Sequence, residues 1–186
     1  MDPVFPSMLQ LHVSRWFNTP KPIVLDDLRG KVVAIHAFQM LCPGCVAQGL
    51  PQAARLRAAF AQDELEVIGL HTVFEHHRVM GPEALEAFIH EYRLSFPIGV
   101  DAPDPAGAVP MTMAAWGLRG TPSLVLLDRQ GRPRLSRFGH IDDMTLGAIV
   151  GQLLDRPHSA DAAAPPARTA RCDGDACSAE PEANKR

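Results

Sequence analysis

The chain has 186 residues, of which 46% are hydrophobic and 21% charged, with a formal net charge of −3. This is the composition of a globular domain with its own core, and it excludes a small scaffold that depends on disulfides. Without a basic surplus, nucleic acid and anionic membrane surfaces are poor partners. The sequence shows neither a basic start followed by an apolar run nor an apolar stretch of about 20 residues. We expect a cytoplasmic protein, or a periplasmic one if a leader was trimmed.

The apolar pattern predicts alternating strands and helices. Residues 32–38 are nearly all apolar, as in a strand that is covered on both faces. Further strands are predicted at 66–71, 96–100, 123–127 and 133–139, and helices at 43–61, 82–92, 111–116 and 141–154. This order predicts an α/β fold with a central mixed five-stranded sheet, made of parallel βαβ units and a C-terminal antiparallel hairpin, flanked by helices.

The composition changes at Asp155. From there to Arg186 the chain contains no Val, Ile, Leu, Met, Phe, Trp or Tyr, so it cannot bury enough apolar surface to offset its ordering entropy. We expect a disordered tail at 155–186 that carries Cys172 and Cys177, after a folded domain at 1–154 whose first 22 residues are a lead-in. The tail cysteines could form a disulfide, bind a metal loosely or shuttle electrons, although neighbouring acids should blunt their reactivity.

The other two cysteines lie at a strand–helix turn, in the sequence Cys42-Pro43-Gly44-Cys45. Reactive groups in open α/β sheets lie beyond the carboxyl ends of the strands. The free N–H groups at the start of the following helix favour a thiolate at Cys42. Cys45, one turn further on, is close enough to form a disulfide with it. This predicts that Cys42 attacks a substrate disulfide and Cys45 resolves the mixed disulfide. A zinc site would need two more ligands, and the only other pair lies in the tail.

Four stretches, in this order and spacing, carry a family resemblance: residues 25–33 (LDDLRGKVV), Cys42–Cys45, Gly120-Thr121-Pro122 and 128–131 (DRQG). Over about residues 23–154 the chain resembles the thioredoxin fold and, within it, the TlpA-like and redoxin (AhpC/TSA-related) thiol–disulfide oxidoreductases. The resemblance implies a thioredoxin-like fold with a strand–helix insertion after the first helix. It also implies a cis Thr121–Pro122 bond that faces the cysteines, with Thr121 pairing its backbone with the substrate.

The same resemblance gives roles to further residues. Pro43 and Gly44, between the cysteines, tune the redox potential in the family, and we count them with Thr121 and Pro122 as candidate substrate-binding residues. His36 stands where thioredoxin has a buried Asp that accepts the proton of the second cysteine, and it could do so with a pKa closer to neutral. The alternative is a core histidine bonded to a backbone carbonyl. Glu75 could accept the same proton if it were buried; otherwise it is a solvated loop residue.

The leading functional prediction is a thiol–disulfide oxidoreductase whose Cys42–Cys45 disulfide is its only redox cofactor, with no metal. Its partners would be a disulfide-containing protein or small thiol, and an external donor such as thioredoxin, glutathione or a membrane electron carrier. The alternative is a peroxiredoxin-type peroxidase using Cys45, although Phe38 and Cys42 replace the Pro and Thr of that family's pattern. A third possibility is a non-enzymatic redox sensor or metal carrier with Cys42 and Cys45 as ligands.

Overall fold

The computed structural model describes residues 9–155, 171–173 and 176–178, and the chain divides into two compact units at residue 156. The first unit contains a six-stranded sheet in the order β1-β4-β3-β2-β5-β6. Its strands are β1 (Val13–Phe17), β2 (Val32–Phe38), β3 (Leu65–His71), β4 (Ile98–Asp101), β5 (Ser123–Leu127) and β6 (Pro133–Phe138). Its helices are α1 (Leu50–Ala59), α2 (Pro82–Glu91), α3 (Met111–Ala115) and α4 (Asp143–Leu154), with 3-10 turns η1 (Leu25–Leu28) and η3 (His77–Val79).

The predicted α/β order is confirmed, with β2 at the centre of the sheet. β2 runs parallel to β3, from Val32 opposite Leu65 to Phe38 opposite His71, and antiparallel to β5. β3 and β4 are also parallel, and β5 and β6 form the predicted antiparallel hairpin. The carboxyl ends of β2, β3 and β4 therefore meet at one edge of the sheet, where reactive groups are expected.

The sheet has six strands and not five, because part of the predicted lead-in forms β1. This strand pairs antiparallel with the edge strand β4, with Val13 opposite Asp101. Gly99 makes room for it, since a Cβ at this position would come within 2.9 Å of a methyl carbon of Val13. Ser14 and Arg15 are exposed, so the short segment lacks the apolar run that identified the buried strands.

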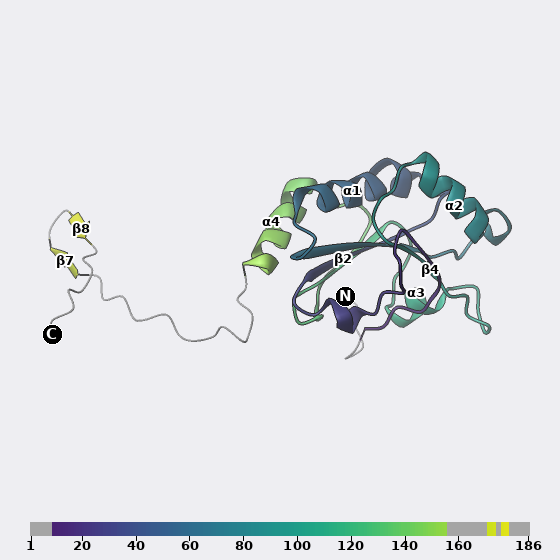
Figure 1. Ribbon diagram of the computed structural model, residues 1–186, viewed down its shortest axis with the longest axis horizontal. Coiled ribbons are helices and arrows are strands. Elements are labelled where there is room, and N and C mark those ends of the chain that lie inside the picture. Colours follow the sequence, from purple (N-terminus) through teal and green to yellow (C-terminus); the bar gives the residue numbers. More distant parts are fainter. Residues whose placement is uncertain (1–8, 156–170, 174–175, 179–186) are drawn as a thin grey trace. The chain divides into compact units, whose positions relative to one another are not determined.

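Two apolar layers cover the sheet. On one face α1, α2 and α4 pack against alternate residues of β2 and β3, including Ala34 and Phe38 (Figure 1). On the other face α3 and η1 contribute Met113 and Leu25 to a smaller core that includes the buried ring of Trp116. Both faces of β2 are thus covered, which explains its uninterrupted apolar sequence. None of the helices in the described residues has the length and apolar character needed to cross a membrane.

The helix predicted at 43–61 is not a uniform α-helix. Residues 43–59 are helical, but Cys45–Gly49 (η2) form a π-helical turn in which the N–H of Leu50 donates to the carbonyl of Cys45. Pro51 supplies the reason, because its ring cannot donate an N–H and would clash with the carbonyl four residues earlier. The turn widens the helix directly after the cysteines, a position typical of functional π-turns.

The predicted disordered tail lies mostly outside the described residues. Within it, β7 (Arg171–Asp173) and β8 (Ala176–Ser178) pair antiparallel, with Cys172 opposite Cys177. These two strands were not predicted from the sequence.

Candidate functional site

Cys42 and Cys45 form a disulfide at the carboxyl edge of the sheet, with their Cα atoms 5.2 Å apart. Cys42 is half-buried, whereas Cys45 is fully buried at the first turn of the helix. The N–H of Cys45 donates to Sγ of Cys42 at 3.2 Å, and the N–H of Cys42 donates to the carbonyl of Gln39 at 3.2 Å. A backbone donor and the positive end of a helix at Cys42 favour its thiolate once the disulfide is reduced.

The Thr121–Pro122 bond is cis, as the family resemblance implied. Sγ of Cys42 lies 3.5 Å from the carbonyl oxygen of Thr121, so this loop faces the disulfide. Pro122 packs closely on two glycines of the helix: a Cβ on Gly44 would lie 3.3 Å from Pro122, and one on Gly49 3.2 Å. Gly49 was missed by the sequence analysis, because its contact with Pro122 leaves no local signal. Pro43 is exposed beside the cysteines.

His36 lies on β2 in the layer that contains Cys45. His36 lies between Ala34 and Phe38 on the same face of the strand, and both of these residues belong to the core cluster that contains Cys45. Burial lowers the pKa of His36 to about 4, so the ring is neutral at neutral pH, and this pKa is lower than the sequence analysis expected. Nε2 of His36 has no hydrogen-bond partner within the part of the chain that the structure describes. Its role as proton acceptor stays a prediction.

His71 is a second buried histidine on the same face of the sheet. It lies opposite Phe38, with ring centres 5.2 Å apart, and burial lowers its pKa to about 4. Neither ring nitrogen has a partner among the described residues. In the sequence His71 is only the last residue of a predicted strand, and its register with Phe38 places it in the same layer as Cys45.

Glu75 is exposed in the loop after β3, so the burial that its predicted role required is absent. Its carboxylate accepts a long hydrogen bond, 3.4 Å, from the side-chain amide of Gln39. The oxygen of the same amide accepts the N–H of Phe74 at 3.4 Å. Gln39 is buried and its carbonyl accepts the N–H of Cys42, so it ties the loop after β3 to the first cysteine.

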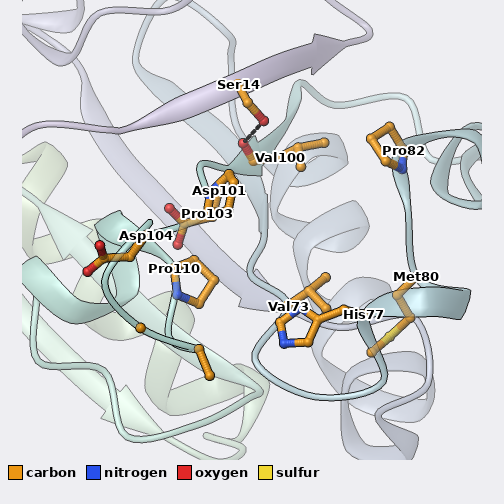
Figure 2. A pocket seen from close by; sticks show the side chains of 12 residues that line it. Ser14, Val73, His77, Met80, Pro82, Val100, Asp101, Pro103, Asp104 and Pro110 are labelled. Carbon is orange, nitrogen blue, oxygen red and sulfur yellow. Dashed lines mark hydrogen bonds between the residues drawn. The ribbon is translucent and has the colours of Figure 1, made fainter.

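A separate pocket of about 380 Å³ lies at the same edge of the sheet, between the loops that follow β3 and β4 (Figure 2). Its lining is mainly apolar, with His77 and Asp104 among its polar side chains, and it includes neither cysteine nor Pro122. Asp101 at the pocket accepts the N–H groups of Thr112 and Met113, while burial raises its pKa. The described residues hold no group of three or more His, Cys, Asp or Glu placed to bind a metal.

Comparison with known proteins agrees with this geometry. The AhpC/TSA family model matches residues 13–132. The crystal structure of a thioredoxin-like superfamily protein is 53% identical, with a TM-score of 0.78, over 80% of this chain and 96% of that chain. A thiol-disulfide isomerase from Corynebacterium glutamicum is 48% identical, with the same TM-score and coverages. At 20% identity, the thiol:disulfide interchange protein DsbE from Chlorobium tepidum shares the fold, with a TM-score of 0.61 over 80% of this chain and 99% of that one. No curated protein matches.

The family match includes the cysteine turn and the cis-proline loop. Together with the Cys42–Cys45 disulfide these similarities identify a redox protein of the thioredoxin fold, related to thiol–disulfide oxidoreductases. Since the family model matches residues 13–132, well over half of the chain, the chain belongs to the AhpC/TSA family.

Proposed function

We propose that the chain is a thiol–disulfide oxidoreductase in which Cys42 is the attacking and Cys45 the resolving residue. The Cys42 thiolate attacks one sulfur of a substrate disulfide, which forms a mixed disulfide and releases one substrate thiolate. The Cys45 thiolate then attacks Sγ of Cys42, which restores the Cys42–Cys45 disulfide and releases the second substrate thiolate. Two electrons pass from the cysteine pair to the substrate, and the protein's own disulfide is the only redox cofactor needed.

One observation carries the order of attack: the two sulfurs differ in access and in hydrogen bonding. Cys42 is half-buried and its sulfur accepts the N–H of Cys45, whereas Cys45 is fully buried. A thiolate must be accessible to reach a substrate sulfur, and a backbone donor stabilises that thiolate. Cys45 needs to reach only Cys42, which its position one turn along the helix allows.

The substrate we propose is a disulfide-containing protein, paired with the backbone of Thr121. The N–H of Thr121 has no acceptor within the described residues, and its carbonyl lies 3.5 Å from Sγ of Cys42. A substrate segment that pairs with Thr121 would bring its own sulfur close to Cys42. The similarity to a thiol-disulfide isomerase supports this substrate class. An external thiol system, such as thioredoxin, glutathione or a membrane electron carrier, would reduce the pair again.

His36 and Glu75 remain our candidates for the group that accepts the proton of Cys45. His36 is neutral at neutral pH and lies in the layer that contains Cys45, but its lowered pKa makes it a weak base. Glu75 is exposed and reaches the site only through Gln39. The pH dependence of the resolving step in His36→Gln and Glu75→Gln separates the two, because only the loss of the true acceptor removes a titration from the profile.

The experiment that tests the function compares wild type, Cys42→Ser and Cys45→Ser. Insulin reduction with dithiothreitol as donor should be lost in both variants, and only Cys45→Ser should accumulate a mixed disulfide. Peroxide consumption is measured in parallel. Rapid peroxide turnover that survives Cys42→Ser and is lost in Cys45→Ser would overturn the proposal in favour of a peroxidase. Stoichiometric metal bound through Cys42 and Cys45, without turnover in either assay, would favour the metal carrier.

A further inference from the structure

An exposed cation lies beside an exposed aromatic ring next to the cis-proline loop. The guanidinium carbon of Arg119 is 5.7 Å from the centre of the Phe138 ring, which is within cation–π range. Phe138 is 49% exposed. Among the residues that the structure describes, Arg119 has no carboxylate within ion-pair distance. The ring therefore holds a guanidinium whose donors remain available to a ligand.

This pair is joined to the disulfide by a short path through the backbone. Phe138 packs so closely on Gly120 that a Cβ there would lie 2.8 Å from the ring. The N–H of Gly139 donates to the carbonyl of Pro122 at 2.8 Å, which fixes β6 to the loop. Thr121, between Gly120 and Pro122, places its carbonyl 3.5 Å from Sγ of Cys42. Arg119 is thus two residues from the backbone group that faces the attacking sulfur.

Different side chains lie on the two sides of Cys42. On the Thr121 side the surface offers the guanidinium of Arg119 and the ring of Phe138. On the Gln39 side it offers the exposed carboxylate of Glu75, and the same loop continues to the exposed Arg78. Leu41, directly before Cys42, is 58% exposed and adds apolar surface at the attacking residue. A substrate segment that passes Thr121 therefore meets a positive charge with an apolar neighbour.

We propose that Arg119 and Phe138 select disulfide substrates that carry a carboxylate side chain one or two residues from the attacked cysteine. This inference rests on the proposed function, since it assumes pairing of the substrate with Thr121. In an extended segment each residue advances about 3.3 Å, so a residue one or two places from the cysteine comes level with Arg119. The guanidinium fork matches a carboxylate in two hydrogen bonds, and a lysine at that place would be repelled.

Phe138 is a positioning residue in this scheme, because it acts through Arg119. Holding the guanidinium over a ring reduces the side-chain freedom that an exposed ion pair otherwise loses on binding. The partner is therefore an acidic, disulfide-bearing segment of another protein. Recognition of this kind affects specificity and the rate of association more than the chemistry of exchange.

The test uses the full chain and three disulfide peptides that are identical except for Asp, Asn or Lys on both sides of each cysteine. We expect kcat/KM for the Asp peptide to exceed that for the Lys peptide about tenfold at low salt, and the ratio to shrink at about 0.5 M salt. Arg119→Glu should reverse the order. Phe138→Leu should lower the ratio about twofold while the order stays.

Lys21→Glu is the matched control, because it makes the same charge change elsewhere. Lys21 follows β1, whose Phe17 lies beside Ile98 at the amino end of β4, at the opposite edge of the sheet from the cysteines. The control should keep the wild-type ratio; a reversal equal to that of Arg119→Glu would overturn the proposal. Equal kcat/KM for all three peptides would also overturn it and leave the proposed function intact. No reduction of any peptide or of insulin would overturn the proposed function itself.

Discussion

Buried polar groups near the two ends of β5 differ in their hydrogen bonding. At its carboxyl end, the buried carboxylate of Asp128 accepts the N–H groups of Gln130 and Arg132 and the guanidinium groups of Arg132 and Arg134, at 2.7–3.0 Å. Burial alone would raise the pKa of Asp128, but these hydrogen bonds outweigh it and lower the pKa. Each oxygen of this carboxylate accepts two hydrogen bonds, as expected of a group that stabilises a turn.

At the amino end of β5, beside Pro122 and the disulfide, the buried histidines of β2 and β3 have unpartnered nitrogens within the described residues. A buried polar atom without a partner costs free energy, and such atoms in native proteins call for an explanation. Their position in the layer that contains Cys45 gives one. The buried polar group at one end of the strand is fully hydrogen-bonded and those at the other end are not, so we expect substitutions at the two ends to separate stability from activity.

The largest expected effect is at the stabilising end. Asp128→Ala removes the acceptor of four hydrogen bonds, and we expect the free energy of unfolding to fall by roughly 3 kcal/mol. The rate of insulin reduction per folded molecule should stay at the wild-type value. Urea denaturation and the reduction assay measure the two quantities. Asp104→Ala is the control, since among the described residues the side chain of Asp104 accepts only the N–H of Ala106, and it should cost about 1 kcal/mol or less. A large loss of activity in folded Asp128→Ala would contradict the expectation that Asp128 affects stability and not activity.

The second largest effect that we expect is a pH dependence of stability that arises from the buried histidines near the disulfide. Burial lowers the pKa of His36 and of His71 from 6.5 to about 4. Between these pH values the unfolded chain binds more protons than the folded one, so the free energy of unfolding falls as the pH falls from 6.5 to 4. We expect a loss of about 2 kcal/mol per histidine between pH 7 and pH 4.5.

His36→Leu and His71→Leu test this assignment. Each variant should lose its own share of the difference in unfolding free energy between pH 7 and pH 4.5, measured by urea denaturation at both pH values. Taking the difference between two pH values removes the constant packing cost of each substitution. An unchanged difference in both variants would mean that neither histidine is held neutral by burial.

The features that could be predicted from the sequence are those that leave a pattern in neighbouring residues. β2 is recognised because both of its faces are buried, and Cys42–Cys45 because the pair lies at a strand–helix turn. The signal for β1 is weak, since two of its five residues are exposed and its partner strand lies far along the chain, with Val13 opposite Asp101. Gly49 gains its meaning only from Pro122, and His71 only from its register with Phe38. These contacts are tertiary, so no local pattern carries them.

Gly49 offers a smaller effect that connects stability with activity. In Gly49→Val the added methyl groups would meet Pro122, which already lies 3.2 Å from a Cβ at this position. We expect a loss of about 1 kcal/mol in stability and a several-fold slower reduction of insulin, because the loop is pushed from Cys42. Gly151→Val in α4 is the matched control, since a Cβ there meets nothing within 4 Å. Equal behaviour of the two variants would show that the contact with Pro122 is unimportant.

The smallest effect is expected at Glu75. Its carboxylate is exposed and receives a single long hydrogen bond of 3.4 Å from Gln39, so an amide in its place should be well tolerated. We expect Glu75→Gln to change insulin reduction by no more than about twofold at pH 7, because an exposed polar contact contributes little. Glu83→Gln, on the exposed side of α2, is the control for the loss of one negative charge. A tenfold slower resolving step in Glu75→Gln alone, with a titration missing from its pH profile, would instead identify Glu75 as the proton acceptor. The reactive site around the two cysteines would then extend through Gln39 to a solvent-exposed carboxylate, and the neutral His36 would have a role in packing alone.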